Sequence, residues 1–225
     1  MVRKPTKTRM EPRKQPAQAR SAATVETIVE AAARILEAKG FQGYNTNDVA
    51  ARAGVSIGSL YQYFPNKDAI TKALIQRETE PLVAEFEQAG DAESLHGGLQ
   101  RFIRAAVVHQ LRRPVLARLL DFEEARLPLR AEVGAVGEIG AAALVRLLAR
   151  NGAGRGAVAE QASRDVLAIV KGMVDAAGER GETDGKGLEA RVTAAVFGYL
   201  QRREIAEPGG PEGISRSSGG RNERR

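Results

Sequence analysis

Hydrogen-bonding side chains gather in one short stretch of the sequence, at Ser59, Tyr61, Gln62 and Tyr63. Short or flat polar groups of this kind can reach phosphate oxygens and base edges in the major groove of DNA. The amide of Gln62 can bond bidentately to N6 and N7 of adenine, so we expect it to read a base directly. The chemistry that this stretch indicates is recognition of duplex DNA.

Two short helices with a tight turn between them must position these side chains. Asn45 or Thr46 can cap the first helix, and Gly54 stands where the turn needs a residue that accepts a positive φ. Ser56 can cap the second helix, and Pro65 ends it. The residues expected in the core of the pair are Val49, Ala50, Val55, Leu60 and Phe64. This pattern predicts a helix-turn-helix.

A longer helix precedes the pair and is expected to start near Thr24. Apolar residues recur at the three-and-four spacing of one helix face from Val25 to Leu36, and Gly40 can end the helix. A third helix that supports the pair makes a compact unit. We therefore expect a three-helix DNA-binding domain over residues 21–67.

Residues 24–74 closely resemble the TetR/AcrR family of bacterial transcriptional regulators. The resemblance rests on a helix that ends in Ala-Lys-Gly-Phe, followed in register by Gly-Val-Ser, Leu-Tyr-Gln-Tyr-Phe and Pro-Asn-Lys. It implies an all-helical homodimer whose two N-terminal units bind a near-palindromic operator. It also implies a divergent C-terminal domain that binds a small-molecule effector, with repression as the family's default action.

The resemblance assigns DNA contacts to matching positions of this sequence. Thr46 stands where many members have an apolar residue, and Asn47 where a longer side chain is common, so the first helix departs from the family pattern. Tyr61 and Tyr63 cannot share one helix face, so we expect one to pack and the other to meet phosphate. The residues expected at the DNA backbone are Thr46, Ser56, Ser59, Tyr61, Tyr63 and Lys67. Those expected to face bases are Asn47, Ile57, Gly58 and Gln62.

The net charge of +6 lies at the two ends of the chain. Residues 1–20 carry +6, residues 21–67 balance at zero, residues 68–207 carry −2 and residues 208–225 carry +2. The composition of both ends predicts disorder. The basic N-terminal arm can neutralise phosphates and enter a minor groove, or it can be a solubilising tail. A second hypothesis follows, in which the protein packages DNA through the arm without sequence preference.

The composition argues against enzymatic chemistry. Cysteine is absent, and His96 and His109 are the only histidines. Asp121, Glu123 and Glu124 near His109 form the one plausible acid-base cluster, and the sequence has no metal-ligand spacing, nucleophile elbow or phosphate-cradling loop. No apolar run approaches the roughly 18 residues that a membrane span requires. We expect a cytoplasmic protein that is not an enzyme and that has no cofactor, metal site or membrane partner.

Residues 68–207 are predicted to form a helical domain for effector binding and dimerisation. A helix starts at Ala69, and Pro81 should kink or restart it, because proline removes one bond of the helical ladder. No segment alternates like a strand, so the fold class is all-α. The further helices are expected at residues 94–113, 114–125, 129–150, 157–179 and 188–206.

The last two of these helices carry apolar stripes wider than one neighbouring helix requires. The stripes suggest a four-helix dimer interface, to which Gly172 and Ala176 would permit close approach; alternatively they complete the domain's own core. A dimer suits a twofold operator, whose successive major grooves lie about 34 Å apart. The candidate interface residues are Val166, Val170, Met173, Val174, Val192, Val196, Tyr199 and Leu200.

An effector pocket is expected among the helices between Ser94 and Met173. Arginines in this region, such as Arg112 and Arg113, could recognise an acidic effector, but weak surface pairs with nearby carboxylates are the favoured interpretation. Each candidate lining residue can also be an ordinary core residue. The candidates are Phe102, His109, Phe122 and Met173.

Overall fold

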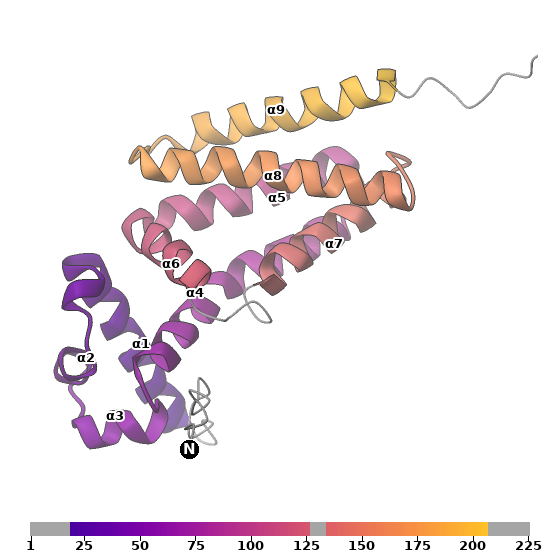
Figure 1. The fold of residues 1–225 in the computed structure, drawn as a ribbon. Coiled ribbons are helices and arrows are strands. Elements are labelled where there is room, and N and C mark those ends of the chain that lie inside the picture. Colours follow the sequence, from indigo (N-terminus) through magenta and orange to yellow (C-terminus); the bar gives the residue numbers. More distant parts are fainter. Residues whose placement is uncertain (1–18, 127–133, 207–225) are drawn as a thin grey trace, which may run out of the picture.

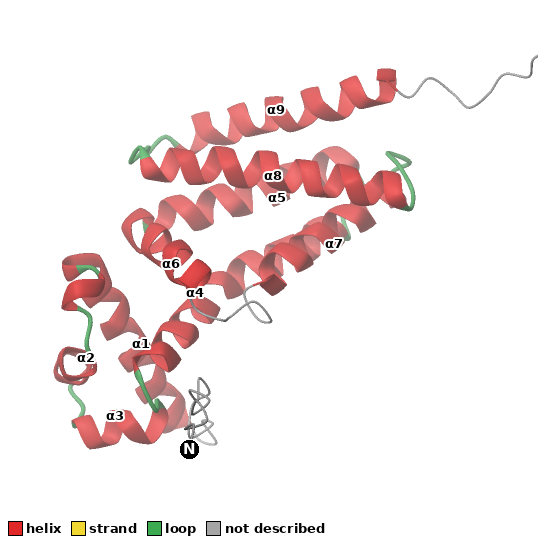
Figure 2. Ribbon diagram, in the orientation of Figure 1, coloured by secondary structure: helices red, strands yellow, loops and turns green. Residues whose placement is uncertain are grey.

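The computed structural model describes residues 19–126 and 134–206, and within these ranges every regular element is a helix. The predicted all-α fold class is therefore confirmed (Figure 2). The expected tail at residues 208–225 lies outside the described residues, as does the arm apart from its last two residues. Those two begin the first helix.

The N-terminal unit lies at one end of the molecule (Figure 1). A long helix crosses a short pair, and a single turn of 3-10 helix connects them. The elements are α1 (Ala19–Lys39), η1 (Phe41–Gly43), α2 (Thr46–Ala53) and α3 (Ile57–Tyr63).

The remaining helices form a bundle that α4 joins to the N-terminal unit (Figure 1). In this bundle α8 and α9 lie side by side and antiparallel, on the side away from α2 and α3. The elements are α4 (Lys67–Gly90), α5 (Leu95–Arg112), α6 (Pro114–Arg126), α7 (Gly134–Arg150), α8 (Ala157–Glu179) and α9 (Gly185–Ala206).

Three helices begin earlier than the sequence predicts, and one of them is α4, which starts at Lys67 rather than Ala69. The first helix starts at Ala19 rather than near Thr24, because the polar residues ahead of the apolar stripe continue the same helix without a stop signal. The last helix starts at Gly185 rather than Leu188, because Asp184 caps it: its carboxylate accepts a hydrogen bond of 2.9 Å from the amide of Gly187. The residues expected at 129–133 lie outside the described ranges.

Helix α4 runs without a break through Pro81, so the expected restart does not occur. Its two halves belong to different hydrophobic cores. Ile70 and Leu74 are buried with α1, α2 and α3, whereas Phe86 and Ala89 are buried in the core of the bundle. Because both ends are held by packing, one missing ladder bond does not divide the helix.

The N-terminal core also recruits residues from beyond residue 67, where the domain boundary was expected. Leu116 and Leu120 of α6 are buried against α1 and the first half of α4, together with the core residues of α2 and α3. Any movement of α6 therefore disturbs the packing of the N-terminal unit directly.

A network of ion pairs crosses the same junction. Arg113, at the end of α5, donates two hydrogen bonds of 2.7 Å to the carboxylate of Glu37 on α1 and one of 3.2 Å to Glu30. The carboxylate of Glu78 on α4, which is buried, accepts from Arg112 at 2.6 Å and also from Arg77. The expectation of weak surface pairs is wrong for Arg113, because its bidentate pair with Glu37 is mostly shielded from solvent.

These contacts shift the ionisation of the glutamates. The hydrogen bonds from Arg113 hold the pKa of Glu37 below its ordinary value. For Glu30 burial favours the neutral form, but Arg113, Arg34 and Arg77 together outweigh burial, so its pKa is also lowered. A carboxyl group with a lowered folded-state pKa stabilises the fold above its unfolded-state pKa and loses that contribution as the pH falls through the folded-state pKa.

We therefore predict that Arg113→Gln lowers the free energy of unfolding by about 1–3 kcal/mol at pH 7. The difference from the unaltered protein should shrink as the pH falls from 5 to 3, because both glutamates become protonated. Urea unfolding at pH 7, 5, 4 and 3 measures this. Arg34→Gln is the matched control: its pair with Glu30 lies within one helix and is exposed, so it should cost less than about 0.5 kcal/mol. A difference for Arg113→Gln that is constant with pH would contradict the ion-pair explanation.

Candidate functional site

The turn between α2 and α3 is built as its residue types predict. The side chain of Asn45 caps α2 by accepting a hydrogen bond of 2.9 Å from the amide of Asp48. Gly54 ends α2 with φ of 68°, a conformation that strains any residue with a Cβ. Ser56 then caps α3 by accepting from the amide of Ser59 at 3.0 Å. These local bonds fix the angle at which α3 leaves the turn.

The inner and outer faces of α3 differ sharply in burial. Leu60 and Phe64 are fully buried against Val49 and the other residues of the N-terminal core. The outer face is open to solvent and includes several candidate contacts. The candidates exposed here are Asn47, Ser56, Ile57, Gly58, Tyr61 and Gln62.

The two tyrosines of α3 lie in different environments. Tyr61 is 40% exposed, and its hydroxyl is 3.1 Å from the hydroxyl of Thr46, so it ties α3 to the first residue of α2. Tyr63 is half-buried and packs against the N-terminal core. Tyr61 is thus the more exposed of the two, while Tyr63 packs against the core.

Gln62 has no partner within the described part of the chain, whereas Lys67 lies over an aromatic ring. Among the residues that the structure describes, none forms a hydrogen bond with the amide of Gln62, which is exposed. Lys67 is the first residue of α4, and its ammonium lies 5.4 Å from the centre of the ring of Tyr44. A cation at a helix start is unfavourable by itself, so the ring of Tyr44 compensates part of that cost.

A cavity of about 260 Å³ lies among helices α4 to α8 and opens to solvent, because Gly137 and Lys171 in its wall are exposed. Two of the four predicted lining residues, Phe102 and His109, line it. Phe122 is 67% exposed and Met173 packs against the bundle core, and neither lines the cavity. The other lining residues are Thr79, Leu82, Phe86, Ala106, Gln110, Asp121, Val136, Gly137, Leu167, Val170, Lys171, Val174 and Asp175.

The range expected for the pocket, Ser94 to Met173, leaves out the α4 wall of this cavity, to which Thr79, Leu82 and Phe86 belong. It includes part of α8, although Val170 and Val174 were also expected at a dimer interface. Periodicity places a residue on the inner face of a helix but does not tell whether that face meets another helix or a void.

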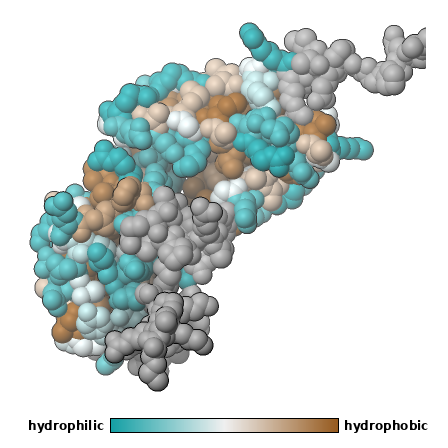
Figure 3. Space-filling model, viewed as in Figure 1, coloured by the Kyte–Doolittle hydropathy of each residue, from teal (hydrophilic) through white to brown (hydrophobic). Residues whose placement is uncertain are grey.

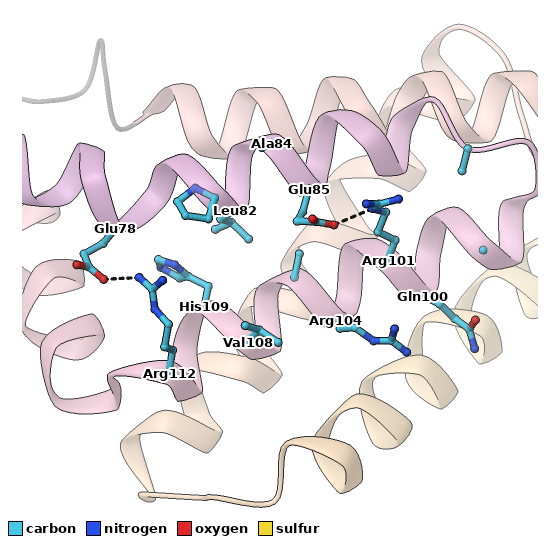
Figure 4. A pocket seen from close by; sticks show the side chains of 14 residues that line it. Glu78, Leu82, Ala84, Glu85, Gln100, Arg101, Arg104, Val108, His109 and Arg112 are labelled. Atoms are coloured by element: carbon cyan, nitrogen blue, oxygen red, sulfur yellow. Dashed lines mark hydrogen bonds and ion pairs between the residues drawn. The ribbon is translucent and has the colours of Figure 1, made fainter.

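A wider groove of about 890 Å³ runs along the outside of α4 and α5 (Figure 4). Its charged walls are largely paired: Glu78 with Arg112, and Glu85 with Arg101. Leu82 and His109 line both the groove and the cavity. These two side chains thus stand between the cavity and the groove.

Most of the predicted interface residues pack against other residues of the same chain. Six of the eight are buried in the bundle core, and Met173 and Tyr199 are half-buried against it. The hydroxyl of Tyr199 on α9 donates a hydrogen bond of 2.6 Å to Asp165 on α8. These side chains therefore have little surface to offer a partner. The six buried residues are Val166, Val170, Val174, Val192, Val196 and Leu200.

Hydrophobic side chains reach the surface around α6, as Figure 3 shows, where Val115 and Phe122 are exposed. Within the described ranges, acidic and histidine side chains form no group of three or more that could hold a metal ion. No helix among the described residues is long and apolar enough to cross a membrane.

Gly54 and Gly58 differ in backbone strain. We therefore predict that replacing each by alanine has opposite effects on the free energy of unfolding. Gly54→Ala should lower the free energy of unfolding by about 1–2 kcal/mol, because alanine is strained at this φ. Gly58→Ala should raise it by up to about 1 kcal/mol, because alanine favours a helix and its Cβ would come no closer than 3.9 Å to Ser56. Urea unfolding of both variants checks the signs, and a destabilised Gly58→Ala variant would contradict this geometry.

Two family sequence models match the chain. The model described as bacterial regulatory proteins of the tetR family matches residues 28–74, and the tetracyclin repressor-like C-terminal domain matches residues 94–200. Together they cover well over half of the chain. The first match corresponds to the N-terminal unit of the structure, together with the start of α4, and the second corresponds to the bundle.

Curated relatives match over shorter stretches. The A-factor receptor protein of Streptomyces griseus is 37% identical over 86 residues, which are 38% of this chain and 30% of that protein. The transcriptional regulator EthR of Mycolicibacterium smegmatis is 35% identical over 82 residues, which are 36% of each chain. The matches thus span about a third of each relative's length.

Solved structures share the fold across most of their length. The fatty acid degradation regulator FadR from Bacillus halodurans superposes with a TM-score of 0.64 at 19% identity, over 77% of this chain and 97% of that one. SmeT, the repressor of a multidrug efflux pump of Stenotrophomonas maltophilia, superposes with a TM-score of 0.63 at 21% identity, over 78% and 89%. The match of both domains, in the order in which the structure arranges them, shows that the chain belongs to the tetR family of bacterial regulatory proteins.

Proposed function

We propose that this protein is a transcriptional repressor that binds a palindromic DNA operator as a dimer and is released by a small-molecule effector. The observation that carries the proposal is the outer face of α3. It is exposed and polar, a capped turn holds it rigidly, and the free amide of Gln62 lies on it. Family membership adds that such units occur in DNA-binding regulators.

In this proposal the candidate residues have distinct roles. Gln62 reads a base, with Asn47, Ile57 and Gly58 beside it at the floor of the groove. The hydroxyls of Thr46, Ser56, Ser59 and Tyr61 and the ammonium of Lys67 meet phosphates. Tyr63 is given no DNA contact, because the core already holds it. Packaging of DNA by the arm alone is not favoured, since it leaves the rigid outer face of α3 without a use.

The cavity among helices α4 to α8 is the proposed effector site, and its position suggests how release occurs. Thr79, His109 and Asp121 line the cavity and also line a small cleft of about 20 Å³ next to Glu78 and Arg113. A ligand that contacts these three side chains is therefore separated only by them from Glu78 and Arg113, which belong to the ion-pair network at α1. A ligand that prefers a different arrangement of these groups would shift the angle of the DNA-binding unit.

For the dimer we propose the outward faces of α8 and α9. Small residues recur there every four positions, so a partner's helices could approach closely. A Cβ built on Gly172 or Gly198 meets no atom within 4 Å in the single chain. The small residues are Ala168, Gly172 and Ala176 on α8, and Ala190, Ala194 and Gly198 on α9.

Readout by Gln62 is tested by comparing two variants on many sequences. Gln62→Ala should relax preference at one base pair of each half-site, at a cost of about 1–3 kcal/mol on the preferred sequence alone. Lys67→Ala should weaken binding to operator and random DNA alike and reduce the salt slope by about one unit. Fluorescence anisotropy with single-substituted duplexes, at several salt concentrations, measures both effects. Equal losses on operator and random DNA for Gln62→Ala would remove the readout assignment.

The dimer surface is tested with Gly172→Leu. The larger side chain meets open space in one chain but would hold two close-packed helices apart, so the dimer should dissociate at least about tenfold more readily. Sedimentation equilibrium measures the dissociation constant. Ala142→Leu, at an exposed position of α7, is the control and should leave it unchanged. An unaltered dimer in Gly172→Leu would place the interface elsewhere.

A further inference from the structure

The walls of the cavity among helices α4 to α8 indicate which class of molecule it accepts. Its apolar part includes Phe86 and Phe102, whose rings stack with centroids 3.9 Å apart, and the valines of α8. Its volume of about 260 Å³ lies below the usual range for drug-sized ligands. The occupant must therefore have a small apolar body.

The polar side of the cavity carries a negative charge. Asp121 of α6 and Asp175 and Lys171 of α8 influence one another electrostatically, and His109 of α5 also feels the charge of Lys171. Burial, followed by the nearby Arg112, lowers the pKa of His109, so its imidazole is neutral at pH 7. Two carboxylates thus face one ammonium.

The two carboxylates are not equivalent. Asp175 accepts a hydrogen bond of 2.7 Å from the ammonium of Lys171. Asp121 is half-buried, and among the residues that the structure describes none donates a hydrogen bond to it. Burial raises the pKa of Asp121, and a bound cation would offset this cost of burying its charge. The charge of Lys171 partly opposes this rise in pKa without a hydrogen bond to Asp121, so a hydrogen-bond donor is what this carboxylate lacks among the described residues.

We propose that the effector is a small organic amine whose ammonium group binds Asp121 and whose apolar body lies against Leu82, Ala106 and Leu167, apolar lining residues that are only partly buried. The role of the amine as an effector rests on the proposed function, whereas its binding to the cavity does not. A carboxylate ligand would place a second anion beside Asp121 and Asp175, where the nearest ammonium is already paired.

The outer groove is a weaker candidate for a ligand site. Figure 4 shows Arg112 paired with Glu78 and Arg101 paired with Glu85, and Arg104 bonds to Glu189 of α9. An anion would have to displace these carboxylates. A cation at Asp121 would displace no hydrogen-bond donor among the described residues.

Three matched probes test the proposal: 3-phenylpropylamine, 3-phenylpropanol and 3-phenylpropionate. Isothermal titration calorimetry at pH 7 without DNA should show the amine binding at least about tenfold more tightly than the alcohol, and the propionate more weakly than both. Asp121→Asn should remove the preference for the amine and leave alcohol binding unchanged. Retained alcohol binding shows that the cavity of the variant is intact.

Glu138→Gln, on the exposed surface of α7, is the control and should keep the preference for the amine. Tightest binding by the propionate, an unchanged amine-to-alcohol ratio in Asp121→Asn, or no binding by any probe would each overturn the proposal. Because binding is measured without DNA, its failure is separate from failure of the proposed function. If the amine binds but does not weaken DNA binding, the proposed amine site is supported and only its role in release from DNA is contradicted.

Discussion

One guanidinium group ties the N-terminal unit to the bundle through ion pairs. Arg113 ends α5 directly before Pro114, and it joins carboxylates from α1 and α4 at the point where the two hydrophobic cores meet. The packing around it is continuous, since α4 crosses from one core to the other and α6 contributes Leu116 to the N-terminal core. Buried or half-buried charges tolerate little displacement, because a carboxylate such as Glu78 becomes very unfavourable once it loses its partners. The junction therefore behaves as an element with few alternative arrangements.

In the proposed function, this constraint gives effector binding a physical route to DNA binding. Asp121 and His109 line the cavity and also lie next to Glu78 and Arg113. A ligand can change the position of α1 only as far as it binds one arrangement of the junction more tightly than another. A cation beside Asp121 adds positive charge close to a network that already gathers three arginines around Glu78. The expected coupling is thus electrostatic and is carried by side chains in contact.

The sequence predicted the N-terminal unit well and the bundle only in outline. Residues such as Asn45, Gly54 and Ser56 act on their own neighbours through caps and a positive φ, so their types alone reveal their roles. The cavity and the junction depend on which helices meet, and that information is not local. Arg113 looked like an ordinary surface arginine because Glu37 lies far from it in sequence. The stripes of α8 and α9 were expected at a dimer interface, with the domain's own core as the alternative. Most of their residues are buried in the bundle core, and periodicity alone does not distinguish a core from an interface.

The central claim is that a dimer reads a specific sequence through α3. The most direct measurement is selection of bound sequences from a random duplex library at near-physiological salt, with the full chain and with a chain that begins at Ala19, where α1 starts. Both proteins should enrich one palindrome whose half-sites are centred about 34 Å apart. No enriched motif from either protein, with binding lost when the arm is removed, would contradict the claim and favour packaging of DNA without sequence preference.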